Sequence, residues 1–224
     1  MRVVTPIVVS AFLAGFLALA MLGIALSTGV AQEYFEAIHS VPEYSRRLLL
    51  EAGTLRLVFT LDNFFLVAYS VFFILFAAER RDAAPGRLLA VMLVFTLVPA
   101  VLDSLENLHI LGMLSSVEQR LPISFTDIQL QALASGAKFH LSYIGAVVLA
   151  VVYPRDTLLE RAVALCIGVV YPILGLAIFT APSAWVFPLV LGRVLFFAFG
   201  YLLSGLVFAL RAARTASPTS PRGG

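Results

Sequence analysis

The stretch LLAVMLVFTLVPAVLDSLENLHIL, residues 88–111, combines the two features that define this chain. It is long and apolar enough to cross a bilayer, which takes about 20 helical residues. Its second half nevertheless carries Asp103, Glu106, Asn107 and His109. Ionisable groups are costly inside a membrane and usually face a protein interior, so they predict a polar site within a transmembrane helix.

The composition of the whole chain agrees with a membrane protein. Of its 224 residues, 61% are hydrophobic and only 12% are charged, whereas a soluble domain carries roughly 25% charged residues. The net charge of +2 gives no indication of nucleic-acid binding. The single cysteine, Cys166, excludes an internal disulfide and lies in an apolar run, where it is expected to pack.

Six apolar stretches are long enough to span a membrane, which predicts an all-α bundle of six transmembrane helices over residues 1–211. The stretches are 3–27, 53–78, 88–111, 131–153, 162–181 and 184–210. Residues 212–224 are rich in Pro, Ser and Gly and are expected to form a disordered tail. The first stretch exceeds the apolar core of a signal peptide, roughly 7–15 residues, so we expect it to be retained. Cleavage after Ala31 is the alternative.

The arginines predict the orientation of the bundle. With both termini in the cytoplasm, nine arginines lie inside and three outside; the inner ones are Arg2, Arg80, Arg81, Arg87, Arg155, Arg161, Arg211, Arg214 and Arg222, and the outer ones are Arg46, Arg47 and Arg120. This bias follows the positive-inside rule and favours the cytoplasmic membrane of a bacterium. The outer segment 28–52 alternates aromatic and charged residues, so it is either an amphipathic interfacial helix or a plain connector.

Ionisable side chains share one depth in four of the predicted helices. Asp62, Asp103, Lys138 and Arg193 each lie about seven to nine residues from the outer end of a helix, which is roughly 10–14 Å below the surface at 1.5 Å per residue. The inner halves of the helices carry no such groups. Opposite charges at one depth predict a nearly neutral, polar pocket that opens toward the outer face.

Helical spacing selects the residues expected to line this pocket. Asp103, Glu106 and Asn107 share one helix face. Ser135, Lys138 and Ser142 share a face of the fourth helix, and His140 and Tyr143 share another. The predicted centre comprises Asp62, Asp103, Glu106, Asn107, Lys138 and Arg193, with Asn63, His109, His140 and Tyr143 as further binding residues.

Lys138, the only lysine of the chain, is the most reactive candidate. A buried lysine can serve as a base or a Schiff-base amine, and a carboxyl such as Glu106 or Asp103 can transfer protons. Glu106, Asp103 and Lys138 are therefore the catalytic candidates. The alternative is a permanent ion pair between Lys138 and one of these acids.

A metal site is a minor alternative. Glu106-x-x-His109 has the spacing of a di-iron bundle motif, but the chain has no second copy. The alternative is a single zinc ion held by Glu106, His109 and His140, which Lys138 and Arg193 would repel. No Gly-rich phosphate loop, Gly-x-Ser-x-Gly or Cys-x-x-Cys motif is present. We therefore expect no cofactor.

Three functions fit these features. The first is binding of a small polar or amphiphilic, lipid-like molecule, with or without chemistry on it, and with membrane lipids as partners. The second is a structural or assembly subunit whose ion pairs lock helix packing, and the third is a small proton-coupled transporter. Two aromatic pairs just below the charged layer, Phe64-Phe65 and Phe196-Phe197, form either a slot for an acyl chain or ordinary packing and lipid-facing surface. Whether the protein is an enzyme stays open.

Overall fold

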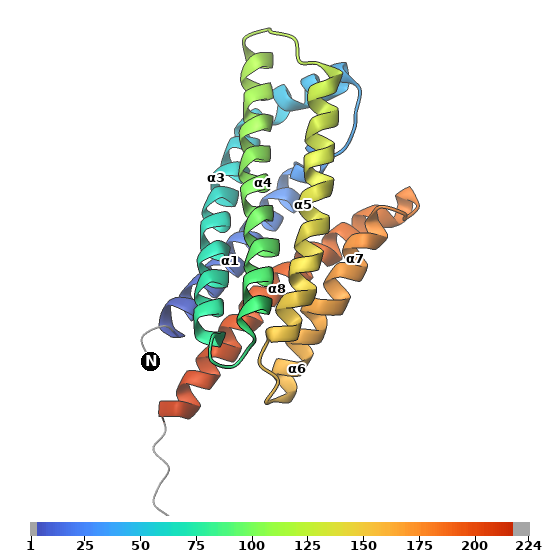
Figure 1. The fold of residues 1–224 in the computed structure, drawn as a ribbon. Helices are drawn as coiled ribbons and strands as arrows, with labels where there is room; N and C mark the ends of the chain where they lie inside the picture. Colours follow the sequence, from blue (N-terminus) through green and yellow to red (C-terminus); the bar gives the residue numbers. More distant parts are fainter. Residues whose placement is uncertain (1–3, 217–224) are drawn as a thin grey trace, which may run out of the picture.

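The computed structural model describes residues 4–216, apart from the side chains of Ser183 and Ala216, and this part of the chain is helical without strands. Six helical segments are long and apolar enough to cross a membrane, as predicted. The elements are α1 (Val4–Thr28), α2 (Gln32–Phe35), α3 (Val41–Arg80), α4 (Gly86–Glu118), α5 (Phe125–Val152), α6 (Leu158–Leu165), a π-helical turn η1 (Cys166–Val170), α7 (Tyr171–Ile178) and α8 (Ser183–Ala216) (Figure 1).

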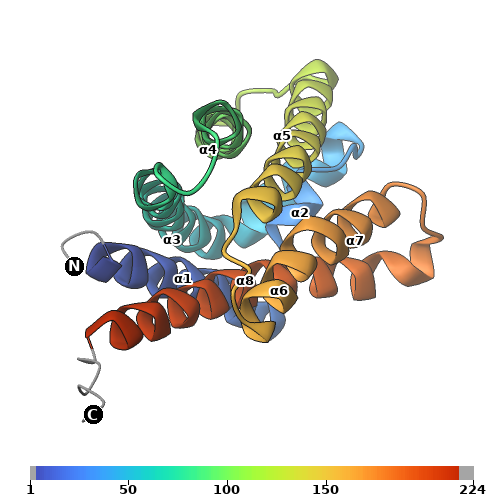
Figure 2. The same cartoon turned by 60° about the horizontal axis from the view of Figure 1, so that its bottom comes forward.

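The long helices form a ring. Helix α1 packs against α3, α3 against α4, and α4 against α5; α5 packs against η1 and α7, α7 against α8, and α8 returns to α1. Figure 2, with the lower end of the bundle turned forward, shows the long helices in this order, with α2 seen behind the centre of the ring. The interior of the ring is therefore lined by side chains from α3, α4, α5, α7 and α8.

The outer segment differs from both expectations for it. Residues 28–52 form neither one interfacial helix nor a simple connector, because α3 begins at Val41 and runs unbroken for 40 residues to Arg80. Pro42 lies in the first turn of α3, where its missing N–H costs no hydrogen bond. A helix of this length spans about 60 Å, so it extends beyond the hydrocarbon core. The short helix α2 precedes it and lies at the end of the ring opposite the end of α8 (Figure 1).

The fifth span changes its pitch near its centre. Pro172 has no N–H, and its ring would clash with the carbonyl of residue 168 in a regular α-helix. The chain widens to a π-turn over Cys166–Val170, where the N–H of Tyr171 bonds to the carbonyl of Cys166. Gly168 lets this turn approach α5, because a Cβ atom at that position would collide with Ala150.

Helix α8 continues to Ala216, so the part of the predicted disordered tail before residue 217 is helical. The remainder of that predicted tail lies outside the described residues. The start of α1 and the end of α8 lie toward the same end of the bundle (Figure 1).

The apolar core is divided in two. The larger part fills the end of the ring where α3 and α5 terminate, and it includes Phe72, Phe76, Tyr153 and Phe208. The smaller part lies at the other end, beneath α2, and includes Phe35, Tyr44, Leu48, Ile110 and Ile128. Between these two parts lie the buried Asp62, Glu106, Asn107, Ser135 and Lys138, so the polar layer is enclosed within the fold.

Candidate functional site

Lys138 on α5 is the centre of the buried polar layer. Its Nζ lies 2.8 Å from Asp103 Oδ1, 3.1 Å from Glu106 Oε1 and 3.2 Å from Glu36 Oε1. An ammonium group has three N–H donors, so these three carboxylates satisfy it completely. The Lys138 side chain is only 6% exposed, and this arrangement holds α4, α5 and the outer segment together.

The other polar groups of the layer extend this network along α4. The hydroxyl of Ser135 donates to Glu106 Oε2 at 2.7 Å, and the Asn107 amide donates to Asp62 Oδ2 at 2.6 Å. The Gln32 amide reaches Asn107 Oδ1 at 3.5 Å. The hydrogen-bond partner of Asp62 is therefore an amide, whereas a basic group was predicted.

Glu33 and Glu36, from the outer segment, belong to the layer and were not predicted. With them, the layer holds five carboxyl groups (Glu33, Glu36, Asp62, Asp103 and Glu106) and two basic groups (Lys138 and Arg193). The near neutrality expected for this layer stays a prediction. The i, i+3 spacing of Glu33 and Glu36 places them on one helix face, but only folding back of the segment brings that face to the layer.

The positions of these two acids affect their titration. Burial would raise the pKa of Glu36, but the nearby Lys138 and Arg193 outweigh it and lower the pKa. Burial and the neighbouring Glu36 raise the pKa of Glu33, which Arg193 only partly offsets. The two carboxyls therefore protonate in a defined order, Glu33 first.

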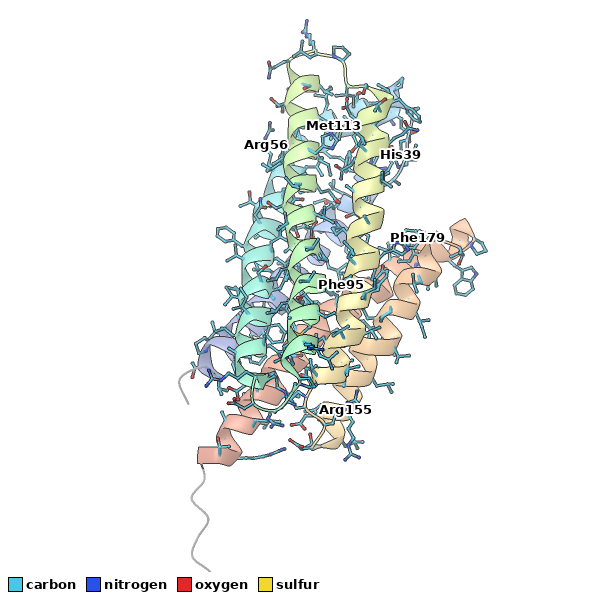
Figure 3. All side chains as sticks on the ribbon, viewed as in Figure 1. His39, Arg56, Phe95, Met113, Arg155 and Phe179 are labelled. Carbon is cyan, nitrogen blue, oxygen red and sulfur yellow. The ribbon has the colours of Figure 1, made fainter. Side chains whose placement is uncertain are left out.

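Arg193 on α8 pairs differently from the prediction. Its nearest carboxylate is Glu33, at 3.9 Å, and not an acid of α3 or α4. The guanidinium carbon lies 3.9 Å from the ring centroid of Phe139, a cation–π contact. Arg56 lies at the periphery of α3 (Figure 3) and pairs with Glu118 at 2.7 Å.

Four predicted binding residues occupy other surroundings. Asn63 is exposed on the outer face of α3, and His140 is exposed on α5, where its Nδ1 lies 2.7 Å from the carbonyl of Gly136. The Nδ1 of His109 lies 3.0 Å from Gln131 Oε1, at the edge of the layer. Tyr143 is buried against Tyr171, with its hydroxyl near Arg193. Assignment of Asn63 and His140 to the pocket was therefore wrong.

The alternative zinc site is not assembled. His140 points away from Glu106 and His109 along a different face of α5. Within residues 4–216, no group of three or more His, Cys, Asp or Glu side chains is placed to hold a metal ion.

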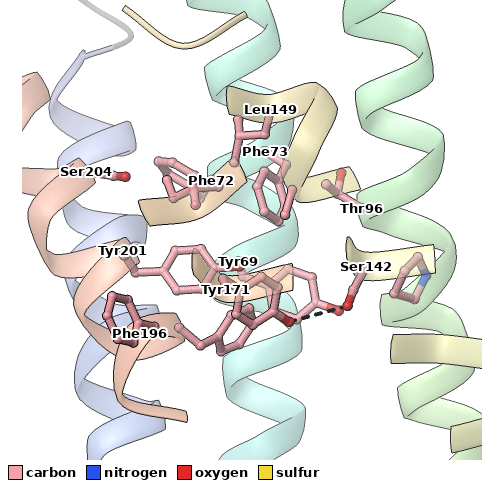
Figure 4. Close-up of a pocket in the computed structure, with 15 residues that line it drawn as sticks. Tyr69, Phe72, Phe73, Thr96, Ser142, Leu149, Tyr171, Phe196, Tyr201 and Ser204 are labelled. Carbon is pink, nitrogen blue, oxygen red and sulfur yellow. Dashed lines mark hydrogen bonds between the residues drawn. The ribbon is translucent and has the colours of Figure 1, made fainter. Parts of the chain in front are cut away.

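Two adjoining cavities lie inside the ring below Lys138. The first, called here the charged chamber, has a volume of about 90 Å³ and is lined by Asp103, Lys138, Arg193 and Phe139, among others. The second, called the aromatic chamber, has a volume of about 80 Å³ (Figure 4). It is lined chiefly by Tyr69, Phe72, Phe73, Phe196, Tyr201 and Leu149.

The two chambers are contiguous. Tyr69, Pro99, Ser142, Tyr171 and Phe197 line both of them. At this junction the Ser142 and Tyr171 hydroxyls lie 3.3 Å apart, drawn as a dashed line in Figure 4. The two chambers therefore adjoin at these residues, one lined by charged groups and the other mainly by aromatic rings.

The outer segment reaches this layer through Glu33 and Glu36, and the expected opening of the pocket toward the outer face stays a prediction. The phenylalanine pairs divide as well: Phe196 and Phe197 line the aromatic chamber, whereas Phe64 is 62% exposed on the outside of the ring. No family model, curated protein or solved structure matches the chain. The geometry of the interior is therefore the basis for a functional assignment.

Proposed function

We propose that the protein is a multi-pass membrane protein that binds an amphiphilic molecule inside its helix ring. The polar head of the ligand lies in the charged chamber, and its apolar part lies in the aromatic chamber. The observation that carries this proposal is the contiguity of the two chambers through their five shared lining residues.

The contrast between the chambers selects an amphiphile over simpler ligands. A wholly apolar molecule would cover Asp103, Lys138 and Arg193 without offering them hydrogen bonds, and burying polar groups in that way is unfavourable. A wholly polar molecule would place polar groups against the rings of Phe72, Phe73 and Tyr201 in the aromatic chamber, which is unfavourable for the same reason. A molecule with one polar and one apolar end satisfies both.

Binding is better supported than chemistry on the ligand. All three N–H donors of Lys138 are held by carboxylates, and a nucleophilic lysine would have to be deprotonated first. The catalytic roles of Glu106, Asp103 and Lys138 therefore stay predictions. Because all three N–H donors of Lys138 are used, the ion pairs also fit the second candidate function, in which they only lock the helices together.

We further propose that both termini face the cytoplasm, in the cytoplasmic membrane of a bacterium. Support comes from the distribution of charge along the bundle. Arg80, Arg81, Arg155, Arg161 and Arg211 lie at the end where α3, α5 and α8 terminate, and basic residues concentrate on the cytoplasmic side of membrane proteins.

Filling the aromatic chamber tests the proposed binding. Ala146 lines this chamber, and Ala137 is exposed on the same helix. The assay measures how far monolauroylglycerol displaces a fluorescent fatty-acyl probe from the protein in lipid nanodiscs. We expect Ala146→Leu to abolish this displacement. The control Ala137→Leu should leave the displacement unchanged. Equal displacement in wild type and both variants would refute the interior site.

A further inference from the structure

We propose that the head group of this ligand carries a single negative charge and binds at Arg193, in the place that the Glu33 carboxylate now holds. This inference rests on the proposed function and adds the chemical class of the ligand.

The two basic groups of the layer differ in how well they are satisfied. Lys138 has three carboxylates within 3.2 Å. Arg193 has one carboxylate within 4.0 Å, that of Glu33, and the distance of 3.9 Å is too long for a hydrogen bond; Glu36 also acts on the Arg193 charge, without an ion-pair contact. The Arg193 side chain is nevertheless only 8% exposed, so it is a buried cation without a close anion among the described residues.

The guanidinium is positioned to receive a ligand. It lines the charged chamber, and its face lies against the Phe139 ring. A guanidinium carries five N–H donors in a planar fork that matches the oxygens of a carboxylate or a phosphate. The nearby Tyr143 hydroxyl is uncharged and forms no well-aligned hydrogen bond with it, so an anion is the group that this position lacks.

The acids of the layer limit the charge of that anion. Four carboxyl groups, Glu33, Glu36, Asp103 and Glu106, already lie at the two basic groups, and each negative charge added to a poorly solvated interior is repelled by those present. A phosphate monoester carries a charge of about −1.5 to −2 at neutral pH and is disfavoured. A carboxylate or a phosphodiester carries a single charge, so a fatty acid or a phosphodiester lipid fits.

Glu33 acts as an internal competitor for this position. Its side chain is 31% exposed and comes from α2, a helix of four residues that lies outside the membrane spans. It is therefore the partner of Arg193 that moves most readily. Removing its charge should strengthen anion binding, an effect that partial unfolding of a variant cannot imitate.

The test compares three probes with the same acyl chain in nanodiscs: laurate, lauroyl-lysophosphatidylglycerol and the neutral monolauroylglycerol. For the wild type we expect at least one anionic probe to bind about tenfold more tightly than the neutral probe, as is typical of a charge-assisted hydrogen bond. Arg193→Gln should remove this preference, Arg193→Lys should keep part of it, and Glu33→Gln should increase it. Arg56→Gln, which changes the peripheral arginine, is the matched control and should have no effect.

The outcomes separate the inference from the function on which it rests. Preference for laurate alone or for the phosphodiester alone supports the inference and identifies the source of the anion. Equal binding of all three probes overturns the inference that the head group is anionic, but it leaves the proposal of amphiphile binding in place. Binding of none of the probes overturns the proposed function itself.

Discussion

The Oε1 atom of Glu36 lies 3.2 Å from the Nζ atom of Lys138, although the two residues are 102 positions apart in the chain. This ion pair joins the outer segment to α5 at the centre of the buried layer. It ties the outer segment to a residue that lines the charged chamber.

Removal of the Lys138 charge should destabilise the fold. Lys138→Met leaves Glu36, Asp103 and Glu106 without their shared cation, and loss of one partner of a buried pair costs about 3–5 kcal/mol. Thermal unfolding in detergent measures the effect.

The matched control is Arg56→Met, because Arg56 forms an ion pair with Glu118 in which its side chain is 51% exposed. Exposed pairs contribute about 0–1 kcal/mol, so this variant should unfold close to the wild-type temperature. Equal destabilisation by the two substitutions would contradict the central place of Lys138.

Loss of the Glu36 charge should loosen the outer segment. Glu36→Gln removes the ion pair that holds this segment to Lys138, so amides of residues 30–36 should exchange hydrogen faster than in the wild type. Amides near Met113 on α4 should keep their rate. Glu118→Gln changes a carboxylate at the periphery and serves as the control; faster exchange of residues 30–36 in that variant as well would argue against a specific role for Glu36.

Anion binding should strengthen as the pH falls toward the ordinary range of a glutamate. Burial and Glu36 raise the pKa of Glu33, whereas Lys138 and Arg193 lower that of Glu36 despite its burial. On acidification Glu33 is therefore neutralised first, and Arg193 loses its competitor while Glu36 still holds Lys138. The raised pKa also means that the folded state binds this proton more tightly than the unfolded chain, so this group adds stability as the pH falls.

The measurement is the affinity of lauroyl-lysophosphatidylglycerol as a function of pH, because its phosphodiester stays ionised throughout this range. Glu33→Gln should show high affinity without this pH dependence. The same pH dependence in Glu33→Gln would exclude Glu33 as the group that titrates.

The proposed orientation predicts which turns a membrane-impermeant thiol reagent reaches in intact cells. Ala83 lies between α3 and α4, and Leu121 lies between α4 and α5; both are exposed. In a Cys166→Ser background, Leu121→Cys should be labelled and Ala83→Cys should be protected until the cells are lysed. The reverse pattern would invert the topology.

Much of the architecture follows from the sequence, because bilayer thickness sets the length of the spans. The shared depth of Asp103 and Lys138 follows as well, since each helical residue adds about 1.5 Å along the axis. The angular position of a side chain is less predictable. His140 lies two positions from Lys138 and turns to a carbonyl of its own helix, because neighbouring helices decide which face is interior.

The acids of the outer segment could not be predicted from depth at all. Glu33 and Glu36 precede α3 and lie outside every span, so membrane thickness does not constrain them. Hydrophobic Phe35, fully buried between them, indicates that this segment folds back, but a single apolar residue does not identify the surface on which it packs.

The most direct test of the central claim is photo-crosslinking with two laurate derivatives, one carrying a diazirine at the end of the chain and one carrying it beside the carboxylate. If an amphiphile binds as proposed, the chain-end probe labels the aromatic chamber at Phe72, Phe73 or Leu149, and the other probe labels Phe139 or Phe65 beside the charged chamber. Excess monolauroylglycerol should suppress both reactions. Labelling confined to lipid-facing residues such as Phe64 and Val67, which are 62% and 64% exposed, and insensitive to the competitor would contradict an interior binding site.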